Sequence, residues 1–166
     1  MKQEAFRKTF PDPDFAEMIV RLRRPRGKVD AILDTDTYNE ADDQYALAYL
    51  LRSPESVNLR AVTAAPFYRD PSQGICRSTD PGDGMEKSYH EILKILRLAG
   101  REDLCGQVFR GATCYLPDEF TPVDSQAVSQ ILAISQQYDE TNPLYLLAIG
   151  AGTNIASALL MDPSLT

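Results

Sequence analysis

Five carboxylates follow directly after a short apolar run in the first third of the chain. The run is residues 29–33, and the acids in the ten residues after it are Asp34, Asp36, Glu40, Asp42 and Asp43. An apolar run that gives way to a helical pattern is typical of a buried strand that feeds a helix. Open α/β sheets bind ligands at the carboxyl ends of their strands, where these acids are expected. So many like charges repel each other unless a hard cation such as Ca²⁺ or Mg²⁺ compensates them. The sequence therefore predicts a metal site.

Two simpler explanations account for less of this acidic turn. In an acidic helix start, the three later acids would complement the helix dipole and Asn39 would cap the helix. That explanation leaves Asp34 and Asp36 without a role. A calcium loop of the EF-hand type also begins Asp-x-Asp, but it then requires Asp or Asn, Gly and Glu at the positions of Tyr38, Asn39 and Tyr45. The loop therefore fails at all three positions.

A phosphatase is a third explanation. The tetrapeptide Asp34-Thr35-Asp36-Thr37 after an apolar strand resembles the first motif of the haloacid dehalogenase superfamily. This resemblance implies Asp34 as the nucleophile, Asp36 as the acid/base and Mg²⁺ as the cofactor. The superfamily also requires a downstream Lys and a second acidic pair after a later strand. The sequence offers no convincing candidate for that pair.

Two motifs in register resemble the inosine–uridine nucleoside hydrolase family. Asp34-Thr35-Asp36, followed by Asp42-Asp43 at a helix start, is similar to the family's N-terminal signature of DTD, a short linker and DD. Far downstream, residues 146–156 (LLAIGAGTNIA) resemble the family's strand, Gly-rich turn and Thr-Asn-Ile-Ala helix start. Residues 59–63 and 108–112 resemble the second and third strands. The resemblance covers the chain from about residue 28 to its end.

The nucleoside hydrolase resemblance implies a Ca²⁺-dependent hydrolase that cleaves the N-glycosidic bond of ribonucleosides and releases base and ribose. Asp36 and Asp43 would bind one Ca²⁺, with the backbone carbonyl of Ile149 as a further ligand. Asp36 would also be the general base for the attacking water, which a cation makes easier to deprotonate. Asp42 would hold a ribose hydroxyl, and Asp34 would orient the ligands from behind. The transition state would resemble an oxocarbenium ion.

The chain departs from the family pattern in three places. The linker Thr37–Ala41 is two residues longer than the usual Pro-Gly-x. Pro66-Phe67-Tyr68 stands where the family commonly has an Asn that touches the nucleoside, so the preferred base and sugar stay open. Family members run to roughly twice this length, and their second half supplies another Asp ligand and a His that assists the leaving base. His90 lies in a different, mid-helix context. We therefore expect the N-terminal portion of a domain, inactive or nearly so alone.

A non-catalytic module is the alternative from another functional class. A degenerate or truncated relative would bind a nucleoside, a sugar or a metal without turnover, or would need a partner chain. Such a half-domain would expose an apolar sheet edge, which favours self-association. We therefore expect a homo-oligomer.

The elements that would position these residues alternate between strand and helix. We expect strands at 29–33, 59–65, 107–109 and 144–149, and helices at 41–51, 85–98, 125–137 and 154–161. This alternation favours an α/β fold: an open, mostly parallel sheet with helices on both faces and a Rossmann-like core, C-terminally incomplete. Residues 1–27 are polar and punctuated by proline, and we expect them to form an N-terminal extension to an α/β domain at 28–166.

Composition limits the partners. The chain has 166 residues, enough for one domain, and its net charge of −7 argues against binding nucleic acid. No apolar run approaches the length that spans a bilayer, and the N-terminus lacks the pattern of a signal peptide. The three cysteines are scattered without a CxxC, which is typical of reduced cytoplasmic thiols. We expect a cytoplasmic protein of nucleoside salvage that acts on a nucleoside or related N-glycoside.

Overall fold

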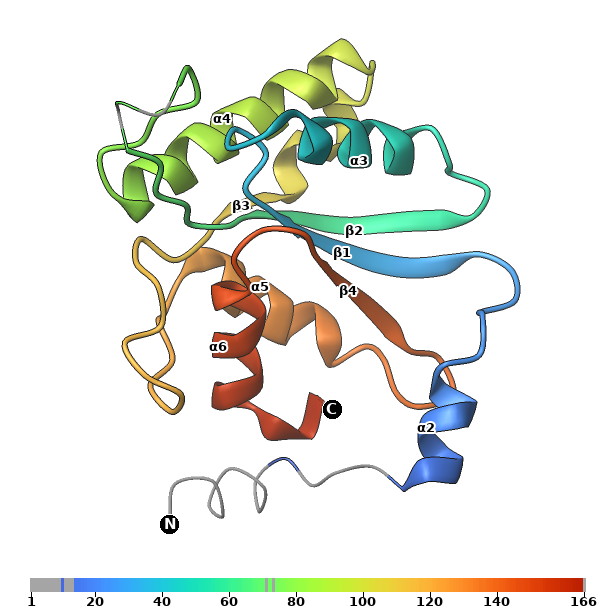
Figure 1. The fold of residues 1–166 in the computed structure, drawn as a ribbon. Helices are drawn as coiled ribbons and strands as arrows, with labels where there is room; N and C mark the ends of the chain where they lie inside the picture. Colours follow the sequence, from blue (N-terminus) through green and yellow to red (C-terminus); the bar gives the residue numbers. More distant parts are fainter. Residues whose placement is uncertain (1–9, 11–13, 71, 73, 166) are drawn as a thin grey trace.

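Four parallel strands form the centre of the molecule (Figure 1). The computed structural model describes residues 10, 14–70, 72 and 74–165. The strands are β1 (Val29–Thr35), β2 (Val57–Ala64), β3 (Val108–Arg110) and β4 (Leu144–Ala148). They lie in the order β3-β2-β1-β4, and every pairing is parallel. The predicted open parallel α/β sheet is confirmed.

Helices cover both faces of this sheet, as the sequence predicts. The covering helices are α3 (Ala41–Leu51), α4 (Pro81–Leu98), α5 (Gln126–Ser135) and α6 (Thr153–Met161). The chain also forms α2 (Phe15–Arg21) before β1 and short 3-10 helices at Glu102–Gln107 and Pro163–Leu165. Figure 1 shows α3 and α4 on one face and α5 and α6 on the other. The apolar residues 31–33 in the middle of β1 follow from this arrangement, because both faces of that strand are covered.

The chain changes direction across the sheet at β1. It moves outward from β1 through α3 to β2 and through α4 to β3, and then returns through α5 to β4 on the other side of β1. Because parallel crossovers are right-handed, the two directions place their helices on opposite faces. The connections after β1 and β4 therefore diverge at the carboxyl edge. Open α/β sheets bind ligands at such a point.

Alternation along β1 decides which face each residue of the acidic turn meets. Leu33 packs into the core cluster with α3 and α4, and Ile32 packs into the cluster with α5 and α6. Since successive strand residues point to opposite faces, the Asp34 side chain points to the same face as Ile32, and the Thr35 side chain to the same face as Leu33. The strand also continues two residues beyond the predicted end at Leu33, so Asp34 lies inside the sheet. This extension explains why Asp34 is fully buried.

Helix α4 begins four residues before the predicted start at Met85. The Asp80 carboxylate accepts a hydrogen bond from the Asp83 N–H at 2.9 Å, and Pro81 occupies the first turn, where its missing N–H has no partner to lose. Gly84 follows in the same helix, and it must be a glycine because a Cβ there would lie 2.0 Å from the carbonyl oxygen of Phe67. The glycines thus serve close packing and do not mark a loop.

The predicted N-terminal extension lies partly outside the described residues. Its described helix, α2, has no buried residue, and Arg21 pairs with Glu140 at 3.7 Å. Among the described helices, none has both the length and the apolar character needed to cross a bilayer. Within the described residues, Cys76, Cys105 and Cys114 carry free thiols.

Candidate functional site

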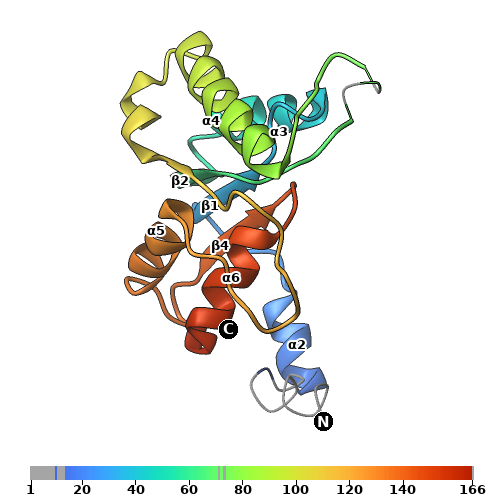
Figure 2. The ribbon, with the colours of Figure 1, turned by 90° about the vertical axis from the view of Figure 1, so that its left-hand side faces the viewer.

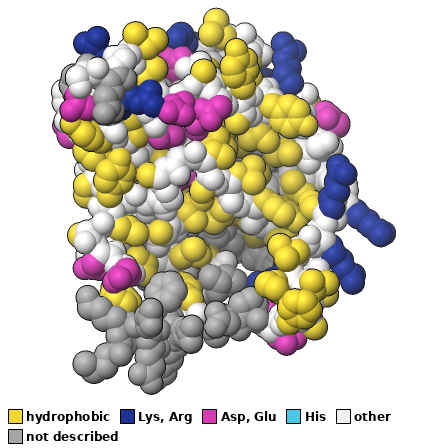
Figure 3. All heavy atoms as spheres, in the orientation of Figure 1, with side chains coloured by type: hydrophobic (Ala, Val, Ile, Leu, Met, Phe, Trp, Pro, Cys, Tyr) yellow, Lys and Arg dark blue, Asp and Glu magenta, His cyan; other side chains and the backbone are white. Residues whose placement is uncertain are grey.

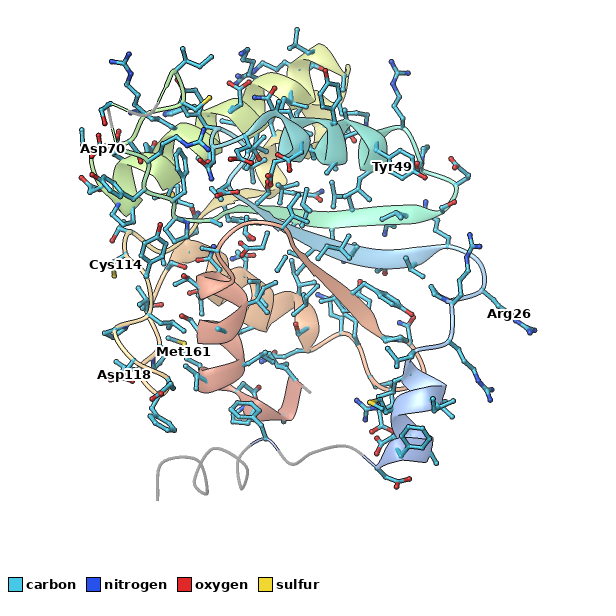
Figure 4. The ribbon with its side chains drawn as sticks, in the orientation of Figure 1. Arg26, Tyr49, Asp70, Cys114, Asp118 and Met161 are labelled. Carbon is cyan, nitrogen blue, oxygen red and sulfur yellow. The ribbon has the colours of Figure 1, made fainter. Side chains whose placement is uncertain are left out.

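The acidic turn lies at the carboxyl edge of the sheet, the edge that faces the viewer in Figure 2. Figure 4 places Asp70, Cys114 and Asp118 on the loops beside this edge and Arg26 at the opposite end of the strands. On the face shown in Figure 3, acidic side chains gather near the same edge, and a group of Lys and Arg side chains projects at the other end. Basic side chains also occur at the carboxyl edge, where Arg69 pairs with Glu40.

Asp34 is a buried carboxylate with one unsatisfied oxygen. Its side chain is 0% exposed, and Oδ1 accepts hydrogen bonds from Thr63 Oγ1 at 2.6 Å and from Asn154 Nδ2 at 2.8 Å. Its Oδ2 is buried without a hydrogen-bond partner. Burial raises the pKa of Asp34 to about 6, against the effect of the two hydrogen bonds, and the negative charge of Asp36 adds to the rise. The position behind Asp36 fits the predicted orienting role.

Asn154 connects three strand ends beneath Asp34. Besides Asp34, its Nδ2 donates to the carbonyl oxygen of Ala64 at 3.1 Å, and its Oδ1 accepts from the Ala112 N–H at 2.8 Å. A Cβ at Gly111 would lie 2.4 Å from Asn154 Nδ2, so the loop after β3 passes directly over this amide. Sequence reasoning gave Asn154 no site role. The available signal was a polar residue at the start of an otherwise apolar helix after a Gly-rich turn.

Asp36 occupies a tight turn that Asn39 closes. The Asn39 backbone N–H donates to the Asp36 carbonyl at 2.7 Å, and Asn39 Nδ2 donates to Asp36 Oδ2 at 3.0 Å. Burial raises the pKa of the Asp36 carboxyl, and the charges of Glu40 and Asp42 act in the same direction, against the Asn39 hydrogen bond. Asp36 is 7% exposed, so a small part of its surface is accessible to solvent.

Asp43 and Asp42 start α3 on the other side of the turn. Asp43 is 6% exposed and accepts a hydrogen bond from Thr35 Oγ1, which itself lies 2.9 Å from Thr37 Oγ1. Burial raises the pKa of Asp43 to about 6, with added contributions from the neighbouring acids, although the Thr35 hydrogen bond opposes the rise. Asp42 is exposed, and its position on the first turn lets it meet a ligand from solution.

The Ile149–Gly150 turn packs against Asp36. The Ile149 N–H donates to the Asp34 carbonyl at 2.9 Å, which continues the β1–β4 ladder past the end of β4. A Cβ at Gly150 would lie 2.8 Å from the Asp36 N atom and 3.0 Å from Asp36 Oδ1. Glycine is therefore needed for this approach. The structure thus brings the backbone of Ile149 to the same edge as the four predicted aspartates.

The loop after β2 holds the acidic turn from outside. Arg69 forms an ion pair with Glu40, and its Nη1 donates to the Asn39 carbonyl at 3.2 Å. Arg69 is fixed in turn by Ser78, whose Oγ accepts from the Arg69 N–H at 2.8 Å. The Tyr38 N–H donates to Ser88 Oγ on α4 at 3.3 Å. Sequence reasoning missed Arg69 and Ser88, because neither belongs to a motif.

The donor set of this edge fits a hard divalent cation. Burial raises the pKa of Asp34, Asp36 and Asp43, and neighbouring acids raise each of these pKa values further. A cation beside them would favour their charged forms. Carboxylate and carbonyl oxygens are the ligands that Ca²⁺ prefers. Across the described residues, no cluster of three or more Asp, Glu, His or Cys side chains stands as a complete ligand set. The predicted set contains two carboxylates and one backbone carbonyl, so it would need further oxygen ligands.

Two cavities at the opposite, amino edge offer a different kind of surface. One, of about 540 Å³, has Asp30 and Asn58 in its wall, and the other, of about 300 Å³, has Arg60 and Arg101 in its wall. Arg60 lies 3.5 Å from Asp30, and Arg101 lies 3.0 Å from Asp103. None of the predicted site residues lines either cavity. Arg60 and Arg101 in these walls are each paired with a carboxylate of the protein.

Comparison with protein-family models, with curated proteins and with solved structures found no match to this chain. The two motifs, and the residues that the fold brings together at the carboxyl edge, are therefore the features that indicate its chemistry.

Proposed function

We propose that the carboxyl edge of the sheet binds Ca²⁺ and hydrolyses the N-glycosidic bond of a ribonucleoside or related N-glycoside. One observation carries the proposal: the Gly150 turn packs against Asp36, although the two residues belong to motifs more than a hundred residues apart. The same two motifs, in the same order, underlie the resemblance to nucleoside hydrolases. Their meeting at a single point of the sheet supports a shared function.

Each acid then has a role that suits its surroundings. Asp36, Asp43 and the Ile149 carbonyl would hold the cation, which when bound supplies positive charge that makes a water easier to deprotonate and orients ribose hydroxyls. Asp36 takes the proton from the attacking water, a role that the resemblance assigns to it and that its position beside the Gly150 turn supports. The exposed Asp42 accepts a hydrogen bond from a ribose hydroxyl, and Asp34 keeps the turn in position from below.

The leaving base presents a separate problem, because a purine or pyrimidine departs poorly unless it is protonated. His90 is the single histidine of the sequence. It lies on α4, and its side chain is 65% exposed and pairs with Glu86 at 3.1 Å. It therefore does not belong to the acidic turn. We expect this chain to cleave natural nucleosides very slowly, and substrates with an activated leaving group faster.

The test compares inosine with p-nitrophenyl riboside, whose leaving group needs no acid. We expect p-nitrophenol release that depends on added Ca²⁺, that a chelator stops, and that Asp36→Asn abolishes. Asp124→Asn changes an exposed aspartate on the segment before α5 and serves as the control. Release at equal rates with chelator, or by the Asp36→Asn variant, would refute the hydrolase proposal.

The free edge of β4 supports a second candidate, a partner-dependent binding module. β4 is the outermost strand of the sheet, its residues 144–148 carry no charge, and the neighbouring Ile149 side chain is 43% exposed. Uncharged edge strands pair readily with other chains. This module would form a homo-oligomer through β4. Light scattering that gives a monomer mass over a hundredfold range of concentration would exclude that assembly.

The buried position of Asp34 weighs against the phosphatase explanation. A nucleophile must reach the phosphorus atom, whereas Asp34 is fully buried and already bonded to Thr63 and Asn154. The direct test is hydrolysis of an aryl phosphate with Mg²⁺. Activity that Asp34→Asn removes would restore this explanation.

A further inference from the structure

Two buried side-chain oxygens in the described structure have no hydrogen-bond partner, and both belong to the acidic turn. They are Asp34 Oδ2 and Asn39 Oδ1. A buried acceptor without a partner destabilises the folded chain, because it has lost its hydrogen bonds to water. Native chains keep such atoms where strain, an ordered water or an ion gives them a purpose. Asp34 is charged and has a predicted role, whereas Asn39 is neutral and has none.

The Asn39 amide folds back over Asp36. Its Nδ2 donates to Asp36 Oδ2 at 3.0 Å, and its backbone N–H donates to the Asp36 carbonyl at 2.7 Å. The other carboxylate oxygen, Asp36 Oδ1, is the one that approaches Gly150. Asn39 therefore fixes one oxygen of Asp36 and leaves the other beside the Ile149–Gly150 turn. The unsatisfied Asn39 Oδ1 is attached to the same amide carbon as the bonded nitrogen, so it lies close to the Asp36 carboxylate within the turn of residues 36–39.

The position of Asn39 is set before any ligand arrives. Arg69 Nη1 donates to the Asn39 carbonyl at 3.2 Å and pairs with Glu40, so both ends of the Asn39–Glu40 peptide are held. The Tyr38 N–H is bonded to Ser88 on α4. A side chain on a turn fixed from both sides loses little conformational freedom when it binds.

We infer that Asn39 Oδ1 is a neutral oxygen ligand of the divalent cation, alongside Asp36 and Asp43. This inference rests on the proposed Ca²⁺ site. Ca²⁺ takes six to eight oxygen ligands, and amide oxygens of Asn are among those it accepts in proteins. Two carboxylates and the Ile149 carbonyl leave several positions open. A neutral ligand also adds coordination without further repulsion in a turn that already holds five acids.

Substitutions at Asn39 separate ligation from simple support. Asn39→Ala removes both the oxygen and the hydrogen bond to Asp36, whereas Asn39→Asp keeps an oxygen but loses the donor. If Asn39 is a ligand, Asn39→Ala weakens Ca²⁺ binding at least tenfold and Asn39→Asp restores it to within threefold of wild type. If Asn39 only donates to Asp36, both variants bind equally weakly, which would overturn the inference. Asn58→Ala, at the amino edge where Asn58 donates to Asp30, is the matched control.

Calorimetric titration of the metal-free chain with CaCl₂ at pH 7.5 is the measurement, with the melting temperature of each variant recorded with and without Ca²⁺. Asn39→Asp adds a sixth acid, so it should melt lower than wild type in chelator and gain more on adding Ca²⁺. If wild type binds Ca²⁺ and the affinity of Asn39→Ala is within twofold of it, the role of Asn39 is overturned while the Ca²⁺ site stands. Wild type that shows neither heat nor a melting shift overturns the Ca²⁺ site and the Asn39 inference together.

Discussion

Asp34→Asn should stabilise the metal-free chain, and the gain should grow with pH. In the unfolded chain Asp34 titrates near the ordinary aspartate pKa of 3.8, whereas burial raises its pKa in the folded chain to about 6. The folded chain therefore holds this proton more tightly, and stability is lost as pH rises from about 4 through 6. The full difference corresponds to about 3 kcal/mol, because one pKa unit equals about 1.4 kcal/mol.

The magnitude that can be observed is smaller, because the unfolded chain already ionises at pH 4.5. Between pH 4.5 and 7.5 the gain of Asp34→Asn over wild type should increase by about 2 kcal/mol. The amide keeps an oxygen that accepts from Thr63 and Asn154, so the hydrogen bonds are retained. The gain therefore reports the ionisation of one buried group.

Urea unfolding followed by far-UV circular dichroism in chelator gives both free energies of unfolding. Asp124→Asn, at an exposed position, is the control and should stay within about 0.5 kcal/mol of wild type at both pH values. A gain that does not change with pH would show that Asp34 is not ionised against its burial. Destabilisation by Asp34→Asn at pH 7.5 would show that Oδ2 has a partner that the carboxylate needs.

Three further predictions concern the turn and its support. Gly150→Ala places a Cβ 2.8 Å from the Asp36 N atom and should weaken Ca²⁺ binding at least tenfold in a calorimetric titration, whereas Gly152→Ala, with nothing within 4 Å of its Cβ, should leave binding unchanged. Asn154→Ala leaves the Ala112 N–H without its partner and removes one of the two hydrogen bonds to Asp34 Oδ1, so it should lower the free energy of unfolding by about 3 kcal/mol in urea. A loss below about 1 kcal/mol would contradict the network. Glu40→Gln weakens the ion pair with Arg69 and should lower the melting temperature by no more than about 4 °C. A pair this exposed contributes about 0–1 kcal/mol, and about 1 kcal/mol shifts the melting temperature of a chain this long by about 2–4 °C.

Local signals in the sequence predicted the elements well. The apolar runs before the acidic turn and before Gly150 became β1 and β4, and the Ala41–Leu51 pattern became α3 with the same ends. Their alternation also predicted the parallel sheet. The predicted start of α4 at Met85 was wrong, because Gly82 and Gly84 are residues typical of a loop. The Asp80 cap and the contact of Gly84 with Phe67 show that both glycines belong to the helix. Glycine serves both purposes, and only the packing partner distinguishes them.

The wider polar network could not be predicted from the sequence. Asn154 meets Asp34 across 120 positions of the chain, and Arg69 reaches Glu40 from a loop that carries no motif. Such contacts depend on the order in which the strands pair in the sheet, and local sequence patterns do not determine that order. Two of the predicted aspartates, Asp34 and Asp36, contact the Ile149–Gly150 turn, because parallel strands place their carboxyl ends together. Their roles in metal binding and catalysis stay predictions.

Calcium titration of wild type beside Asp36→Asn tests the central proposal most directly. We predict one Ca²⁺ bound per chain, little or no heat with the Asp36→Asn variant, and an unchanged fold of that variant by circular dichroism. Binding that survives the loss of the Asp36 charge, or a wild-type chain that takes up no Ca²⁺ at millimolar concentration, would contradict it.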